Sequence, residues 1–317
     1  MTIAFGPVPS RRLGRSLGIN NIPPKSCSYS CLYCQVGATK GQIVEPRNFY
    51  TPEEIFQEVS AKVKKAYSAD EPIEYLTFVP DGEPTLDINL GEAINLLRSL
   101  NIPIAVISNA SLLSRKNVRD AIAKADWVSV KVDSIDTGIW QQINRPHESL
   151  HLRDIQEGIR KFAKQFDGQL VSETMLVDGI NDSQDSVTGV ADFLHEIGVS
   201  KAYLSIPTRP TAEVGIRPPG ELVVNHAYQI FDSKLSHVEY LIGYEGDAFA
   251  FTGDIRQDLL SITAVHPMRE SAVRELLKRA EAESSVVSEL ITEGMLKKVE
   301  YRGNRYYVRR FSGQNNN

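Results

Sequence analysis

Strand-length runs of apolar residues alternate with amphipathic, helix-length runs through most of the chain. Six strand-like runs cover 16–22, 75–80, 102–109, 127–134, 170–177 and 201–207, and 238–244 is a candidate seventh at an edge. Runs with the apolar spacing of a helix lie between them, at 51–67, 88–100, 114–125, 152–166 and 183–198. This order is typical of repeated βα units around a parallel sheet or barrel, so the sequence predicts an α/β fold.

The βα alternation stops near residue 251. Beyond it, 268–280 and 284–294 have helical patterns, and 295–310 predicts two strands joined by a turn at Gly303 and Asn304. Helix, helix and hairpin in this order resemble a winged helix, which can bind nucleic acid or simply hold proteins together. We therefore expect a barrel over 1–250, a winged-helix domain over 256–311 and a disordered tail over 312–317.

Composition and charge are those of an ordinary soluble enzyme, with 42% hydrophobic and 24% charged residues. No run has the apolar length that export or a bilayer requires, so we expect a cytoplasmic protein without a membrane partner. A net charge of −5 argues against a general attraction to nucleic acid. The segment 296–310 is an exception, because it carries six Lys and Arg against the single acid Glu300. Its tyrosines, Tyr301, Tyr306 and Tyr307, could stack on RNA bases.

All three cysteines of the chain, Cys27, Cys31 and Cys34, fall within eight residues. An odd, clustered set argues against a disulfide framework and indicates ligands. A structural zinc ion would need a fourth ligand from a distant histidine, and catalytic zinc usually has a mixed ligand set. The alternative is a 4Fe–4S cluster held by three thiolates, with one iron open to a small ligand.

Residues 127–134 alternate, with three valines on one face and three polar residues on the other: Ser129, Lys131 and Asp133. In a barrel the polar face points into the lumen, where buried charges need a partner or a ligand. A purely structural ion pair between Lys131 and Asp133 is the alternative.

The spacing C-x3-C-x2-C, with Tyr33 before the last cysteine, resembles the radical S-adenosylmethionine (SAM) superfamily, and the resemblance covers about the first three-quarters of the chain. It implies a partial (β/α)6 TIM-like barrel with the site at the C-terminal strand ends. It also implies a 4Fe–4S cluster on the three cysteines and SAM as cofactor, cleaved by one electron to a 5′-deoxyadenosyl radical that abstracts hydrogen. A one-electron donor such as flavodoxin or ferredoxin is the implied partner.

The resemblance also implies a set of SAM-binding residues. The segment "FVPDGEPT" stands where the family has a glycine-glycine-glutamate pattern, with aspartate in place of the first glycine. A Ser-Asn pair near the methionine moiety matches 108–109, although helix capping explains that pair equally well. With the polar face of 127–134, the expected set is Asp81, Gly82, Glu83, Ser108, Asn109, Ser129, Lys131 and Asp133.

Two further residues are candidates for the substrate side. Glu173 could face the lumen, and Arg209 could bind an anionic group of the substrate or the cofactor carboxylate. The N-terminal Arg11, Arg12 and Arg15 could form a phosphate patch, but a solvated arm explains them more simply.

Within the superfamily, "FGPVPSRRLGRSLGINN" and "CSYSCLYCQVG" look most like proteins grouped with the tRNA wyosine-base synthase, which rebuilds a modified guanine with a two-carbon unit from pyruvate. That synthase would need a second cluster, and no cysteine remains for one, so its pyruvate chemistry and catalytic lysine are not carried over. The leading prediction is tRNA modification. The alternatives are an activase or modifier of a protein or peptide, and an Fe–S redox sensor with a nucleic-acid-binding winged helix.

Overall fold

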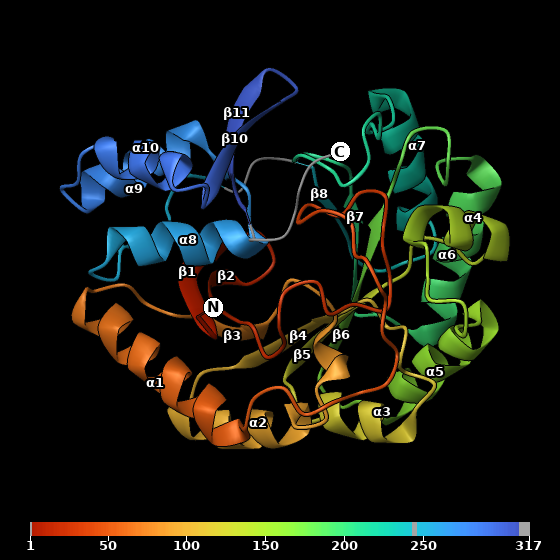
Figure 1. The fold of residues 1–317 in the computed structure, drawn as a ribbon. Coiled ribbons are helices and arrows are strands. Elements are labelled where there is room, and N and C mark those ends of the chain that lie inside the picture. The colour runs from red at the N-terminus through yellow and green to blue at the C-terminus, as the bar shows by residue number, and fades with distance from the viewer. Residues whose placement is uncertain (1, 243–245, 311–317) are drawn as a thin grey trace.

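An eight-stranded sheet curls into a half-barrel in the computed structural model, which describes residues 2–242 and 246–310 (Figure 1). The strands follow in chain order across the sheet: β1 (Ala4–Ser10), β2 (Gly14–Ile19), β3 (Tyr75–Phe78), β4 (Ile104–Ser108), β5 (Trp127–Lys131), β6 (Gln169–Met175), β7 (Lys201–Ser205) and β8 (Val238–Leu241). Strands β1 and β2 pair antiparallel, and every later neighbour pairs parallel. The half-barrel therefore has two edges, β1 and β8.

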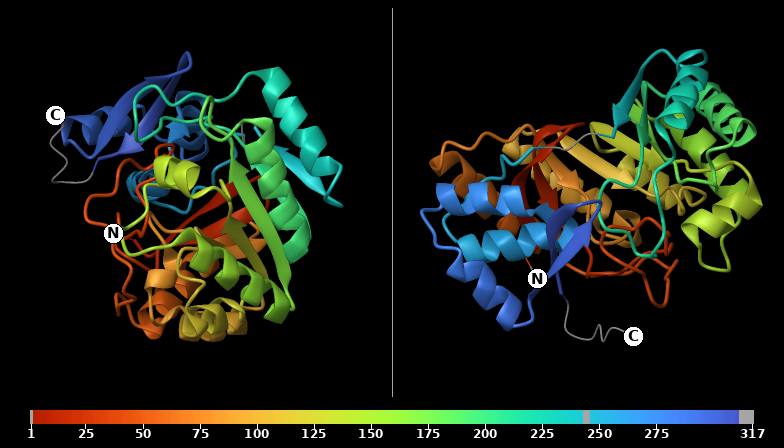
Figure 2. Two further views of the ribbon diagram at one scale, coloured as in Figure 1. Left: turned by 90° about the vertical axis from the view of Figure 1, so that its right-hand side faces the viewer. Right: turned by 90° about the horizontal axis from the view of Figure 1, so that it is seen from above.

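Helices cover the outer face of this sheet (Figures 1 and 2). They are α1 (Pro52–Ser68), α2 (Leu90–Leu97), α3 (Lys116–Ile122), α4 (Thr137–Asn144), α5 (Leu152–Gln165), α6 (Gln184–Ile197) and α7 (Glu221–Asp232), with short 3-10 turns at Pro84–Leu86 and Arg98–Leu100. The three valines of 127–134 lie in the core between sheet and helices, as their alternation predicts. No helix among the described residues is both long and apolar enough to span a bilayer.

The start of α1 shows how local sequence sets an element. The Thr51 side chain accepts a hydrogen bond from the Glu54 amide, and the Glu54 carboxylate accepts one from the Thr51 amide. Pro52 occupies the first helical position, where its missing N–H costs nothing. The predicted start of this helix is confirmed.

Residues 255–309 form a second, smaller unit, called here the C-terminal unit. It contains α8 (Ile255–Val265), β9 (Met268–Arg269), α9 (Glu270–Arg279), α10 (Ser285–Thr292), β10 (Leu296–Tyr301) and β11 (Asn304–Arg309), with the sheet order β10-β11-β9. A separate hydrophobic cluster holds it together, centred on Leu259, Leu276 and Leu290. Its two predicted helices and hairpin are confirmed, and α8 and β9 complete a winged-helix order.

The six predicted strands are present, and β8 corresponds to the candidate seventh. The last two residues of that candidate, 243 and 244, and the predicted tail lie outside the described residues. Strand β1 was not predicted because Pro7 and Pro9 argue against a strand. Both are tolerated because β1 is an edge strand with a bulge between Phe5 and Val8. Helices α4 and α7 were also not predicted.

The predicted hairpin turn is wrong by one residue. Tyr301 pairs with Asn304, so the turn residues are Arg302 and Gly303. Both have positive φ angles, of 50° and 71°, as the tight two-residue turn of a β-hairpin requires.

The C-terminal unit packs against both sides of the gap in the half-barrel. On the β1 side, the Ala250 amide donates to the Pro7 carbonyl at 3.1 Å, and Lys62 of α1 donates to Asp258 of α8 at 2.8 Å. On the β7 side, hydroxyls of the hairpin β10–β11 bond the backbone of 207–208. The C-terminal unit therefore covers the space between β1 and the loop after β7, as Figure 2 shows from above.

Candidate functional site

The three cysteines lie on one loop between β2 and α1, and each is half-buried with a free thiol. Neighbouring segments hold this loop by its backbone. The Leu32 amide donates to the Ile143 carbonyl at 3.0 Å, and the Leu32 carbonyl accepts from the Glu213 amide at 3.1 Å. The cysteine loop is thus placed by the end of α4 on one side and by the loop after β7 on the other.

Side-chain amides point at two of the sulfurs. Asn109 Nδ2 lies 3.6 Å from Cys27 Sγ, and Asn144 Nδ2 lies 3.5 Å from Cys31 Sγ. Burial raises the pKa of all three thiols, that of Cys31 to about 12. A metal cluster that binds thiolates would take the place of these protons, and amide donors to sulfur would stabilise the bound charge.

This donor set fits a 4Fe–4S cluster: three thiols on one loop, two of them with N–H donors already in place. In the described part of the chain, no three His, Cys, Asp or Glu side chains converge closely enough to share one metal ion. The residues that would hold the cluster are Cys27, Cys31 and Cys34.

Asp81 and Gly82 support the cysteine loop from the end of β3. The Asp81 carboxylate forms an ion pair with Lys25 at 3.2 Å, and burial raises the pKa of Asp81 to about 6 in spite of that cation. Gly82 makes a bridge to Ser26, with φ at 152°, and a Cβ there would overlap the Ser26 carbonyl oxygen. Glycine is therefore required at position 82 because its backbone lies directly against Ser26, the residue before Cys27.

Glu83 is fully buried and joins the ends of β3 and β4. Its carboxylate accepts hydrogen bonds from the Ser108 hydroxyl at 2.8 Å, the Asn109 amide at 2.6 Å, and the Thr85 hydroxyl and amide at 2.7 and 3.1 Å. Burial raises the pKa of Glu83, and these donors oppose the rise. Asn109 then extends the network to the cysteine loop through Ser28, at 3.0 Å.

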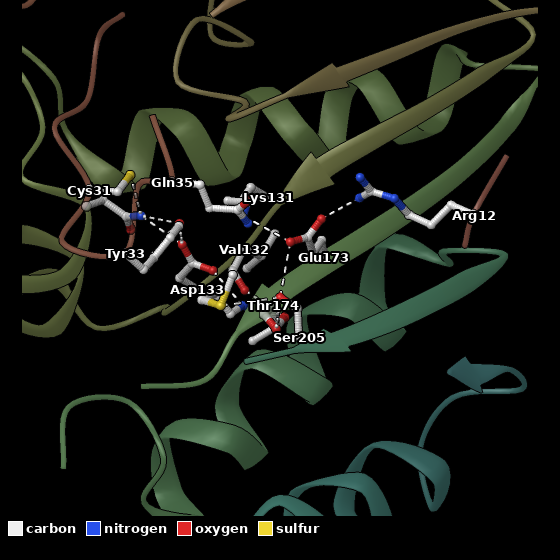
Figure 3. Close-up of polar contacts among 12 residues, drawn as sticks. Arg12, Cys31, Tyr33, Gln35, Lys131, Val132, Asp133, Glu173, Thr174 and Ser205 are labelled. Carbon is white, nitrogen blue, oxygen red and sulfur yellow. Dashed lines mark hydrogen bonds and ion pairs between the residues drawn. The ribbon is translucent and has the colours of Figure 1, made fainter. Parts of the chain in front are cut away.

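A row of charged side chains crosses the lumen, as Figure 3 shows. Lys131 of β5 lies 3.1 Å from Glu173 Oε1, and Arg12 donates to Glu173 Oε2 from the opposite side. Ser205 of β7 adds a hydrogen bond to Glu173 at 3.1 Å. Burial would raise the pKa of Glu173, but Lys131 and Arg12 outweigh burial and hold that pKa well below its usual value.

Lys131 itself is held as an ammonium. Burial lowers the pKa of Lys131, but the carboxylates of Glu173 and Asp133 outweigh burial, so the pKa lies above its usual value. Its Nζ also lies 4.8 Å from the centre of the Tyr33 ring. Lys131 can therefore act as a fixed cation rather than as a nucleophile.

Asp133 does not form the ion pair with Lys131 that the sequence offered as an alternative to ligand binding. Its carboxylate accepts hydrogen bonds from the Tyr33 hydroxyl, from Asn144 Nδ2 at 2.7 Å and from the Met175 amide at 2.8 Å. The direct ion-pair partner of Lys131 is Glu173, and Asp133 acts on the lysine through its charge without contacting it. Asp133 instead joins the cysteine loop to the end of β6.

A cavity of about 300 Å³ extends from Cys34 to the end of α8. Lys131, Glu173 and Arg209 line it, so the Glu173 side chain faces the lumen. Arg209 Nη1 donates to Gln35, next to Cys34, at 2.7 Å. Glu83, Ser108 and Asn109 form a separate hydrogen-bonded network beside Cys27, and Asp81 and Gly82 contact the residues that precede Cys27. Ser129 is buried within β5 and is not among the residues that line this cavity.

The sequence did not identify several residues of the site, and the expected solvated arm is wrong for Arg12 and Arg15. Arg12 enters the lumen, and Arg15 pairs with Glu71. Asn144 gave no signal because its short helix was not predicted. Period-2 alternation in 201–207 does place Ser205 on the same face as Tyr203, and this signal could have marked it as a lumen residue.

The tyrosines of the hairpin β10–β11 are not available for stacking on bases. Tyr306 is 1% exposed, and its hydroxyl donates to the Thr208 carbonyl at 3.1 Å. Tyr307 is also buried, and the half-buried Tyr301 donates to the Pro207 carbonyl at 3.1 Å. Tyr301 and Tyr306 thereby hold the two residues that precede Arg209.

Comparison with known proteins agrees with this geometry. A model of the Radical SAM superfamily matches residues 21–188. The UPF0026 protein MJ1312 of Methanocaldococcus jannaschii is 46% identical over 319 residues, covering 100% of this chain and 99% of that protein. The chain belongs to the radical SAM superfamily, and it is an enzyme of that class. Within the superfamily, its full-length likeness to the M. jannaschii protein places it with the UPF0026 proteins.

Solved structures share the fold. A radical SAM methyltransferase from Sphaerobacter thermophilus superposes with a TM-score of 0.54 at 17% identity, covering 71% of this chain and 66% of that one. A structure of TYW1 with a lysine-pyruvate adduct bound gives a TM-score of 0.51 at 16% identity, covering 70% and 74%. The partial TIM-like barrel is thus the fold of the superfamily.

Proposed function

We propose that this enzyme uses a 4Fe–4S cluster on Cys27, Cys31 and Cys34 to cleave SAM and abstract hydrogen from a substrate. When bound, the cluster and SAM supply a 5′-deoxyadenosyl radical through one-electron reduction. The observation that carries the proposal is the position of Cys34, on the wall of the same cavity as the buried cations and carboxylate of the lumen. A redox sensor would have no use for such a charged interior.

The residues around the cysteine loop divide into supports and ligand contacts. Asp81 and Gly82 brace the loop, and Glu83, Ser108 and Asn109 form a polar wall beside Cys27 on which the methionine part of SAM would lie. Lys131 would supply a cation for a carboxylate, and Asp133 positions Tyr33. Ser129 is kept among the proposed SAM-binding residues only because it lies on β5 with Lys131, where it is buried.

A one-electron donor such as flavodoxin or ferredoxin is the proposed redox partner. For the substrate we favour tRNA, because exposed cations on the hairpin β10–β11 could contact phosphates, and the fold is shared with TYW1. Binding there would depend on charge rather than on stacking, since the hairpin tyrosines are buried or bonded to 207–208. A protein or peptide docked on the C-terminal unit is the second candidate.

Anaerobic reconstitution tests the reaction. The protein is loaded with iron and sulfide, dithionite and SAM are added, and 5′-deoxyadenosine is measured by mass spectrometry. We expect 5′-deoxyadenosine from the wild type and none from Cys31→Ala, which removes one ligand of the cluster. A loaded wild-type protein that forms none, with either tRNA or cell extract present as a source of substrate, would contradict the proposal.

A further inference from the structure

Arg12 is the one residue of the charged row that comes from the antiparallel hairpin at the edge of the sheet. It follows β1 and lines both the 300 Å³ cavity and a smaller polar pocket of about 90 Å³ next to it. Its Nη1 donates to Glu173. Among the described residues, Nε and Nη2 of Arg12 have no hydrogen-bond partner, so these two donors are available to a ligand in the cavities that Arg12 lines.

Cations outnumber carboxylates among the side chains that line the cavity, where Arg12, Lys131 and Arg209 stand against Glu173. Arg12 and Lys131 share the single carboxylate of Glu173. Asp133 also acts on Lys131 through its charge, but its carboxylate faces Tyr33, Asn144 and the Met175 amide and does not line the cavity. An excess of cations on the wall of a partly dehydrated cavity favours the entry of a further negative charge.

The position of Arg12 separates it from the expected cofactor site. In Figure 3 it lies at one end of the row and Cys31 at the other, with Lys131 and Glu173 between them. The small pocket beside Arg12 is lined by Ser10, Ser205 and Thr208, and its other charged lining residues are Arg11, Arg209 and Glu173. Hydroxyls and a guanidinium with two unused donors form a suitable environment for anionic oxygen atoms.

We propose that Arg12, supported by Lys131, binds an anionic oxygen group of the substrate, a carboxylate or a phosphate. That the anion belongs to the substrate rests on the function proposed above. The planar guanidinium can present two parallel N–H donors to such a group while it keeps its bond to Glu173. Val265 and His266 of the C-terminal unit line the same cavity, so this unit helps to set the size of the group that fits.

Binding of small anions to the cluster-loaded protein with SAM present tests the site. Sodium acetate and inorganic phosphate are titrated by calorimetry at constant ionic strength into the wild type, Arg12→Gln and Arg12→Lys. We expect the wild type to bind at least one of the two anions, and Arg12→Gln to weaken that binding by about tenfold or more. Arg12→Lys keeps the positive charge but loses the paired N–H donors of the guanidinium, so its affinity for the anion should fall between those of the wild type and Arg12→Gln. A preference for acetate identifies a carboxylate group, and a preference for phosphate identifies a phosphate.

Arg160→Gln is the matched control, because Arg160 makes a surface ion pair with Glu196 between α5 and α6. It should bind the anions as the wild type does. The proposal is overturned if neither anion binds the wild type, or if Arg12→Gln or, should that variant not fold, Arg12→Lys binds as tightly as the wild type. It is also overturned if SAM affinity falls as much as anion affinity, since Arg12 would then serve the cofactor. Anion binding without 5′-deoxyadenosine formation would remove the proposed function and leave the anion site.

Discussion

At the scale of single residues, Glu173 is the side chain on which the charged lumen depends. It is the common partner of Arg12, Lys131 and Ser205. Without it, two cations would face each other with little water to screen them. The lowered pKa of Glu173 has the same origin, because both cations favour the ionised carboxylate.

Glu173→Gln should lower the free energy of unfolding at pH 7 by about 3 kcal/mol, the low end for a broken buried ion pair because both cations keep some contact with solvent. The folded pKa of Glu173 lies below its ordinary 4.5, so its contribution is complete above that pH and is lost as the pH falls through the folded pKa. The difference between wild type and variant should therefore shrink below pH 4.5. Urea denaturation of both proteins at pH 7, 5 and 3.5 measures it.

Glu196→Gln is the control for this prediction, because Glu196 pairs with Arg160 on the surface. Surface pairs contribute little to stability, so this variant should unfold almost as the wild type does. A gap between wild type and Glu173→Gln that stayed constant down to pH 3.5 would show that packing, rather than charge, explains the effect.

At the scale of elements, the hairpin β10–β11 fixes the loop after β7. Tyr301 and Tyr306 donate to consecutive carbonyls of that loop, at Pro207 and Thr208. The next residue, Arg209, bonds Gln35 beside Cys34. The C-terminal unit is thereby connected to the cysteine loop through three residues of backbone.

Tyr306→Phe should release one of these contacts without changing the packing of the ring. Because the hydroxyl bonds Thr208 and also accepts from Arg269 at 3.1 Å, its loss should cost about 1–2 kcal/mol of stability. Amide hydrogen exchange in 206–212, followed by mass spectrometry, should become faster. Tyr228→Phe is the control, since Tyr228 makes one long bond of 3.4 Å to Val238 on the far edge. Equal exchange in both variants would mean that the hairpin does not hold the loop.

At the scale of the whole molecule, the charge distribution decides how a nucleic acid could bind. The net charge of −5 repels a polyanion, so any binding must depend on a local group of cations. On the hairpin side, Arg302, Arg305 and Arg310 are exposed, whereas burial lowers the pKa of Arg309. The exposed arginines are therefore the ones to test.

Replacing Arg302, Arg305 and Arg310 together with glutamine should weaken tRNA binding, and the slope of log affinity against log salt should become shallower by about 3, one unit for each phosphate contact. Filter binding at several salt concentrations measures both. The control replaces Arg153, Lys161 and Lys164 of α5 with glutamine. These three residues are also exposed, so their replacement removes the same charge at a site away from the hairpin. If both triple variants bound tRNA equally, the nucleic-acid role of the hairpin would be excluded.

The sequence by itself determined the parts that depend on local pattern. Alternation and helical spacing predicted strands β2 to β8 and most of the helices, because burial on one face imposes a period along the chain. The clustered cysteines predict the metal ligands of the proposed function, and alternation in β5 placed Lys131 in the lumen. In each case the signal lies within a few neighbouring residues.

Only the tertiary structure decided which of these residues meet. Arg12 and Glu173 are 161 positions apart, and nothing local to either shows that the β1–β2 hairpin brings them together. The same holds for the hairpin tyrosines, whose composition suggested RNA stacking but whose hydroxyls are committed to 207–208. Pairing across a curled sheet depends on how the strands close around the lumen, and that closure is set by the packing of the whole chain.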